Sequence, residues 1–430
     1  MSVTQQILRN NTILITEPIA TVKTVAIGFW FSAGSRYENE KNRGISHFVE
    51  HMLFKGTETK SAFELACAFD KIGGYVNAFT EREQICLQCV VPANFSDYAF
   101  SILCDMTENS VFSPIEFEKE RSVIESEIIS SQDDPEEAAL DSVLLAVLPD
   151  NSISWNICGS VESVRNLTVD DLKAWYQHYI KNGELVICVS GNIDEAQIQK
   201  VAEKLSRKAE IGTVSSEILK KKLPQWRSTA GASPLHYLKA DFQQEQIMLL
   251  FPLKLPVTEK RYYTLAVLNA LTGDTMSSRL FQLLREKGGF CYNVYSFFTI
   301  CMDCGFWAAY CSVPKNKAAE VCRLLKEEMR LIKESFFADD EISAAKEHLC
   351  GEEIIGGEDI ESRMKRLYRN FSYGFAQCSI EESIRKIRAV TEDELKECVK
   401  ELYNFENEAF VLYGPEFTEK QKQKIEKGVK

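Results

Sequence analysis

The sequence contains no run of about 18 apolar residues, the length that a membrane-spanning helix requires. It therefore predicts no transmembrane helix. The first residues, MSVTQQILRNNTILITEPIA, lack the charged start, apolar core and small-residue cleavage site of a secretory signal. They are not an Arg-rich amphipathic presequence either. We therefore expect a cytoplasmic protein without a membrane partner.

Positive charge is scarce in this chain. The 50 Lys and Arg residues are outnumbered by 63 Asp and Glu residues, so the formal net charge is −13. Surfaces that bind nucleic acid need clustered Lys and Arg to contact phosphates, so the charge argues against a nucleic-acid partner. Basic or unfolded peptides fit an acidic protein better.

Cysteine is not scarce, but its 14 residues lie scattered through strand-like and helix-like segments, where Cys behaves as a small apolar residue. This distribution favours a reducing compartment over a disulfide framework. The pairs Cys86/Cys89 and Cys301/Cys304 leave a four-Cys zinc site as an alternative. In QICLQCVV, however, strand residues three apart point to opposite faces, so the two sulfurs would diverge.

At 430 residues the chain is too long for one ordinary core. Both halves end in a β-run, a Gly turn and a charged helix, as ELVICVSGNIDEAQIQKVAEKL and EAFVLYGPEFTEKQKQKIEKG show. The pattern predicts an α+β protein of two homologous α/β sandwich domains, related by internal duplication, each a mixed or antiparallel sheet covered by helices. We expect domains at 1–212 and 233–430, joined by a linker at 213–232.

Two of the five histidines lie together in GISHFVEHMLFKGT, a helix-like stretch. Residues four apart share one side of a helix, so His47 and His51 can direct their imidazoles at one point. Glu50 borders the same face. The pattern H-x-x-E-H is the inverted form of the zinc signature H-E-x-x-H, in which a carboxylate activates a metal-bound water.

A third ligand is expected on the acidic helix within SPIEFEKERSVIESEII. With Glu120 as reference, Val123, Ile124, Glu127 and Ile128 fall on the same side of this helix. The two carboxylates would then interrupt an apolar stripe that faces the core, where an isolated carboxylate needs a cation. Glu127 is the candidate third ligand and Glu120 a carboxylate that orients a ligand, although ordinary Arg or Lys partners remain an alternative.

The combination of HFVEHMLFKGT with Glu127 in ERSVIESE resembles the pitrilysin-type (insulinase) inverzincin zinc metallopeptidases, most closely their processing-peptidase branch. The resemblance covers the whole chain, including AGSRYE at 33–38, LREKGGFCY at 284–292 and ESRMKRL at 361–367. It implies a peptidase that cleaves unfolded peptides or small polypeptides inside a closed clamshell chamber.

The resemblance also implies the roles of the site residues. One Zn²⁺ per chain would be held by His47, His51 and Glu127, and Glu50 would be the general base that activates a zinc-bound water. Glu120 would orient a ligand.

Substrate handling is implied by two further stretches. Asn77 and Ala78 match positions that contact the substrate backbone, and Phe79 lines a pocket, although it reads equally well as a buried strand residue. Arg285 and Tyr292 match a pair that anchors the substrate and donates to the developing oxyanion. If the chain forms the homodimer that is usual at this length, this pair would act at the zinc site of the partner subunit.

Two alternatives stay open at this stage. The chain could be the catalytic subunit of a heteromeric processing peptidase, or a non-catalytic structural subunit of the same fold. The presence of all three ligands, the base and the Arg/Tyr pair favours a catalytic chain.

Overall fold

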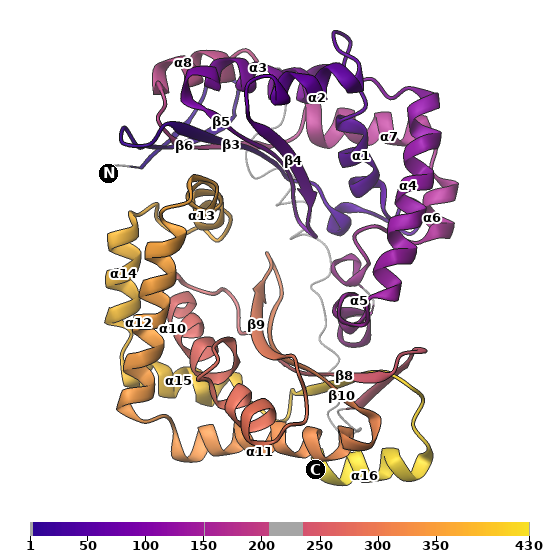
Figure 1. The fold of residues 1–430 in the computed structure, drawn as a ribbon, viewed down its shortest axis with the longest axis vertical. Helices are drawn as coiled ribbons and strands as arrows, with labels where there is room; N and C mark the ends of the chain where they lie inside the picture. The colour runs from indigo at the N-terminus through magenta and orange to yellow at the C-terminus, as the bar shows by residue number, and fades with distance from the viewer. Residues whose placement is uncertain (1–2, 150, 206–234, 430) are drawn as a thin grey trace. The chain divides into compact units, whose positions relative to one another are not determined.

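The computed structural model describes residues 3–149, 151–205 and 235–429. The expected linker at 213–232 lies outside these residues, so the predicted domain limits stay a prediction. The described chain forms two compact units, each built on one sheet (Figure 1). Unit 1 holds the described residues of Met1–Ser131, Asn151–Lys222 and Ile355–Ile380, and unit 2 those of Gln132–Asp150, Leu223–Ile354 and Glu381–Lys430.

The sheet of unit 1 has six strands in the order β1-β2-β6-β3-β5-β4, with β2 and β6 parallel and every other pair antiparallel. Its central strands are buried almost throughout, because helices cover both faces of the sheet. The strand β4 lies at one edge. The strands are β1 (Thr4–Ile7), β2 (Ile13–Pro18), β3 (Thr24–Phe31), β4 (Tyr75–Thr80), β5 (Ile85–Pro92) and β6 (Leu185–Gly191).

Unit 1 has eight α-helices among its described residues. The helices are α1 (Ile45–Leu53), α2 (Ala62–Asp70), α3 (Ser96–Asn109), α4 (Pro114–Asp133), α6 (Val161–Asn166), α7 (Val169–Trp175), α8 (Glu195–Ala202) and α13 (Ile360–Ser372). The helix α4 runs two residues past the limit of the unit.

Unit 2 repeats this plan with five strands in the order β7-β11-β8-β10-β9, and its one parallel pair is β7 with β11. The order matches β2-β6-β3-β5-β4 of unit 1 strand for strand, as the predicted duplication requires. The strands are β7 (Leu235–Lys239), β8 (Gln244–Pro252), β9 (Val294–Ile300), β10 (Gly305–Pro314) and β11 (Ala409–Gly414). The helices are α5 (Pro135–Val147), α10 (Glu259–Asn269), α11 (Ala318–Ser335), α12 (Asp339–Gly356), α14 (Ile380–Ala389), α15 (Glu392–Leu402) and α16 (Glu419–Val429).

One helix of each half of the chain belongs to the other unit. The helix α13 packs on the sheet of unit 1, where the ring of Tyr368 stacks on that of Trp30 with centroids 4.6 Å apart. Glu17, fully buried in that sheet, accepts hydrogen bonds from Arg363 at 3.0 Å and Arg366 at 2.9 Å. Chain order therefore does not define the two cores.

The reciprocal helix is α5, which packs on the sheet of unit 2 beside β8 and β11. Its Glu136 accepts hydrogen bonds from Asn293 at 3.1 Å and Tyr295 at 2.8 Å. In the described part of the chain, no helix is both long enough and apolar enough to cross a bilayer.

Candidate metal centre and active site

The helix α1 begins on a glycine and is capped from outside. Gly44 has φ 87°, which favours glycine, and it offers no side chain to the first turn. Instead the buried carboxylate of Glu38 accepts the N–H of Gly44 at 2.8 Å and the N–H of Ser46 at 3.0 Å. Burial raises the pKa of Glu38 to about 7 and outweighs these two bonds, which lower it. The cap fixes the start of the helix that carries the H-x-x-E-H motif.

The three expected ligands meet between α1 and α4. The rings of His47 and His51 lie edge to face with centroids 4.6 Å apart. Glu127 reaches them from α4, with one carboxylate oxygen 3.5 Å from Nε2 of His47 and the other 3.4 Å from Nε2 of His51. Among the described residues, these three form the one group of His, Cys, Asp or Glu side chains whose ligand atoms all lie within 4.8 Å of one another.

This donor set fits zinc. Two imidazole nitrogens and one carboxylate oxygen are the ligands of catalytic zinc sites, which keep a fourth position open. Hydrogen bonds from His47 and His51 hold the pKa of Glu127 well below its usual range, so the carboxylate is charged. Burial lowers the pKa of His51, but hydrogen bonds to Glu127 and Glu120 outweigh it and leave the pKa raised. The ligand atoms of both imidazoles and of the charged carboxylate thus lie close together, as they do around a bound cation.

Glu120 holds the second nitrogen of His51. It is buried on α4, its Oε2 lies 3.1 Å from Nδ1 of His51, and its Oε1 lies 2.6 Å from Nζ of Lys55. With a cation bound, this contact would keep the imidazole proton on Nδ1 and leave the lone pair of Nε2 for the cation. The geometry agrees with the orienting role expected of Glu120. Glu120 thus also has a lysine partner of the kind that the sequence left open as an alternative.

The expected burial of α4 is wrong at two positions. Glu120, Ile124 and Ile128 are buried, but Val123 is 50% exposed and the side chain of Glu127 is 45% exposed. Position along the axis explains the glutamate, because seven residues place Glu127 about 10 Å further along α4 than Glu120, at nearly the same angle. The ligand cluster is therefore open to solvent on the Glu127 side.

Glu50 lies on α1 between the two histidines. Its Oε2 accepts a hydrogen bond from the hydroxyl of Thr80 at 2.7 Å. Cys158, from the loop before α6, places its sulfur 3.9 Å from Nε2 of His47. The sequence pattern singled out neither Thr80 nor Cys158, because both come from segments far along the chain.

The three expected substrate-binding residues lie on the edge strand β4. Oδ1 of Asn77 accepts the N–H of Ala78 at 2.9 Å. Phe79 packs against the cluster between the sheet and α13, and Nζ of Lys365 lies 5.6 Å from the centroid of its ring. These contacts give Phe79 a packing role, and its pocket role stays a prediction.

The Arg/Tyr pair lies in unit 2, in the segment between α10 and β9. The guanidinium carbon of Arg285 lies 4.6 Å from the centroid of the Tyr292 ring, and Tyr292 is 78% exposed. The structure brings these two residues together, and their action at a zinc site stays a prediction.

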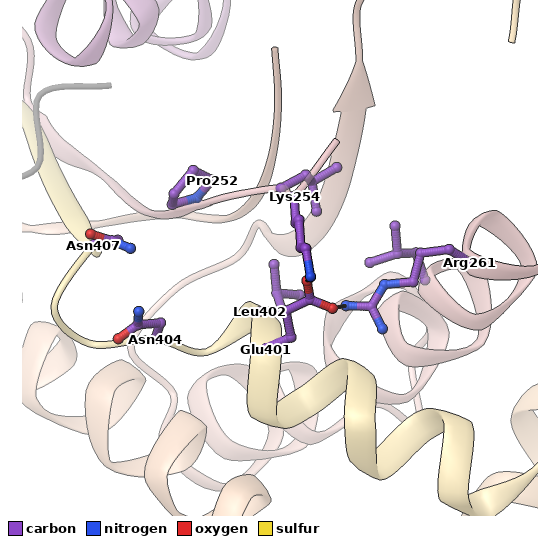
Figure 2. Close-up of a pocket in the computed structure, with 9 residues that line it drawn as sticks. Pro252, Lys254, Arg261, Glu401, Leu402, Asn404 and Asn407 are labelled. Atoms are coloured by element: carbon purple, nitrogen blue, oxygen red, sulfur yellow. Dashed lines mark hydrogen bonds and ion pairs between the residues drawn. The ribbon is translucent and has the colours of Figure 1, made fainter. Parts of the chain in front are cut away.

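Unit 2 also contains a cavity of about 260 Å³ where β8 ends beside α15 (Figure 2). Its charged groups are paired with one another: Glu401 accepts a hydrogen bond from Arg261 at 2.8 Å and lies 3.4 Å from Nζ of Lys254. The cavity has none of the chemistry of the histidine site.

Comparison with known family models identifies the family of the chain. The family model described as "Insulinase (Peptidase family M16)" matches residues 13–159, and the model "Peptidase M16 inactive domain" matches residues 166–349. The chain belongs to peptidase family M16. The ligand cluster and Glu50 lie in the first match, and the Arg/Tyr pair lies in the second.

Relatives and solved structures agree with this family. The chain is 32% identical to the uncharacterized zinc protease YmxG of Bacillus subtilis, over 95% of this chain and 97% of that protein. It is 29% identical to an uncharacterized zinc protease of Streptomyces coelicolor, over 90% and 84% of the two chains. The fold matches a protease from Helicobacter pylori, with a TM-score of 0.86 at 18% identity over 96% and 99% of the chains. It also matches a peptidase M16 inactive domain from Pseudomonas fluorescens, with a TM-score of 0.85 at 16% identity over 97% and 99%. Family membership supports a metallopeptidase, and the names of the relatives imply zinc.

Proposed function

We propose that the chain is a zinc-dependent endopeptidase that hydrolyses unfolded peptides and small polypeptides. The observation that carries the proposal is the carboxylate of Glu127 lying 3.5 Å and 3.4 Å from the Nε2 atoms of His47 and His51, with Glu50 between them on α1. These three residues would hold one Zn²⁺ per chain.

Zinc, when bound, supplies a Lewis acid that polarises a peptide carbonyl and lowers the pKa of water. The chain supplies the proton transfers. The carboxylate of Glu50 takes a proton from the attacking water as the new C–O bond forms at the peptide carbonyl. Glu50 then returns this proton to the amide nitrogen as the C–N bond breaks, so that the carboxylate is regenerated.

The substrate would bind as an added strand. The edge of β4 that faces away from β5 is open for main-chain hydrogen bonds within the described sheet of unit 1. An extended peptide can pair there beside Asn77 and Ala78, which favours unfolded segments over folded ones. The net charge of −13 favours basic peptides.

We further propose a homodimer that encloses a chamber, in which Arg285 and Tyr292 of one subunit act at the zinc site of its partner. The contact between these two side chains supports their working as a unit. A guanidinium can anchor a substrate carbonyl or carboxylate, and a phenol can donate to an oxyanion.

The test replaces Glu50 by Gln, which preserves size and removes the base. In E50Q we expect zinc content to match that of the wild-type chain and kcat on a basic peptide to fall by about 10²- to 10⁴-fold. A chelator should abolish wild-type activity, and added zinc should restore it. The control is E118Q, whose side chain is 62% exposed on α4. Full activity of E50Q, or of the chelated chain, would refute the proposal.

A further inference from the structure

The hydroxyl of Thr80 makes a direct contact with the proposed base. Thr80 ends β4, and its backbone is held by pairing with Ile85 of β5. Its Oγ1 lies 2.7 Å from Oε2 of Glu50, which comes from α1, thirty positions earlier in the chain. An ionised carboxylate only accepts hydrogen bonds, so the hydroxyl is the donor.

We propose that Thr80 is a positioning residue that holds the carboxylate of Glu50 in its working orientation and ties that orientation to the peptide-binding strand. The inference rests on the proposed function and adds to it a residue outside the H-x-x-E-H motif.

The contact restricts a side chain that is otherwise free to rotate. Glutamate has three rotatable bonds, and reaction requires the base to lie within hydrogen-bond reach of one proton. Among the described residues, Thr80 is the one hydrogen-bond donor that Glu50 has. The β-branched side chain of threonine is itself stiff at χ1, so a strand threonine is a more rigid anchor than a longer hydroxyl or amide side chain.

The same contact separates the roles of the two carboxylate oxygens. The hydroxyl proton occupies Oε2, and none of the described residues donates to Oε1. Oε1 is thus the oxygen left for the attacking water. When Glu50 has taken the proton there, Oε2 can still accept from Thr80, so the orientation survives the transfer.

The position of Thr80 also links substrate binding to the base. It directly follows Asn77, Ala78 and Phe79 on the same strand. A peptide that pairs with the edge of β4 orders the strand that carries the hydroxyl. We therefore expect binding of the substrate backbone to fix the base, which favours hydrolysis of peptides that pair along the whole strand.

The test compares Thr80→Val, which keeps the shape and removes the donor, with Thr80→Ser, which keeps the donor. In T80V we expect kcat on a basic peptide to fall by about tenfold or more while KM stays within about threefold, because orientation of the base is lost and binding is not. Zinc content should equal that of the wild-type chain, and T80S should keep kcat within about threefold. In the E50Q background, T80V should have no further effect, since its partner is already replaced.

A crystal structure of metal-free T80V gives a readout that needs no activity. The side chain of Glu50 should leave its wild-type position, and in T80S it should keep it. Unchanged kcat in T80V, or a Glu50 side chain that stays in place, would overturn the proposal. Inactivity of the wild-type zinc-loaded chain would instead refute the proposed peptidase, and the Glu50 position in T80V would still decide whether Thr80 orients it.

Discussion

The two histidines of α1 differ at their second ring nitrogen. Nδ1 of His51 contacts Glu120, which is paired in turn with Lys55. Nδ1 of His47 is buried and has no hydrogen-bond partner in the described part of the chain. Of the two rings, only that of His51 is therefore held at Nδ1 by another described residue, which is Glu120.

Replacing Glu120 by Ala should weaken zinc binding without removing a ligand. The change frees the His51 ring and leaves Lys55 unpaired near the cation, so we expect affinity to fall by about 10- to 100-fold. Competition with a chromophoric chelator measures this. E118A, which alters an exposed glutamate of the same helix, should bind zinc like the wild-type chain. Equal affinity of E120A and E118A would contradict the orienting role.

The cap on α1 makes stability depend on pH. The pKa of Glu38 is about 7 in the folded chain, compared with an ordinary value of 4.5, so between these values the folded state binds the proton more tightly than the unfolded state. The contribution of Glu38 to the free energy of unfolding therefore falls as pH rises from 4.5 to about 7 and is constant above that.

Urea unfolding of metal-free wild-type and E38Q chains checks this. The difference between wild type and E38Q should be most favourable to the wild type near pH 5 and least favourable near pH 8. Because both chains share all other titrating groups, the difference isolates Glu38. A difference that grows in favour of the wild type as pH rises would show that the helix cap lowers the pKa instead.

The local parts of the site were predictable and the distant contacts were not. The spacing of His47, Glu50 and His51 is fixed by helix geometry, so the sequence alone places them on one side. Glu127 was a candidate from its angle on the helix, although it is less buried than expected, and the family resemblance gave it the ligand role. Thr80 contacts Glu50 because α1 packs beside β4, and the periodicity of the sequence does not predict this packing.

At the scale of elements, the sequence predicts that α13 forms but does not predict where it packs. Its periodicity predicts a helix near 359–374, and the structure has one at Ile360–Ser372. Its place on the sheet of unit 1 depends on long-range contacts. These include the stacking of Tyr368 on Trp30 and the buried pairing of Glu17 with two arginines. Strands β1 and β7 have only four and five residues, so sequence periodicity alone does not predict them.

The contact between Glu17 and α13 gives a prediction about stability. In E17A, the buried guanidinium of Arg366 and its neighbour Arg363 lose their carboxylate partner. We therefore expect the free energy of unfolding to fall by about 3–5 kcal/mol. Urea denaturation measures the loss. E118A breaks an exposed ion pair with Arg121 and should change stability by less than about 1 kcal/mol. Similar stability of the two variants would show that α13 is held by its apolar face alone.

At the scale of the whole molecule, the two units exchange helices, because α13 of the second half belongs to unit 1 and α5 of the first half belongs to unit 2. The duplication of one α/β unit was predictable from the similar ends of the two halves. The exchange was not, because each helix has the periodicity of any helix that covers a sheet.

The proposed sharing of the site between subunits can be tested by mixing two inactive chains. H47A removes a zinc ligand, and R285A removes the proposed anchor. If the pair acts on the partner subunit, a mixed dimer contains one intact site, and activity should partly return on mixing. Each variant mixed with itself is the control. No recovery, in a sample shown by mass to contain mixed dimers, would place the pair at the site of its own subunit.

The central claim is that His47, His51 and Glu127 hold one zinc ion. Anomalous scattering at the zinc edge from crystals of the zinc-loaded chain tests it most directly. The account predicts one peak per chain, at about 2.0–2.2 Å from Nε2 of both histidines and from a carboxylate oxygen of Glu127. A peak elsewhere, or no peak at these three residues in a folded chain, would contradict it.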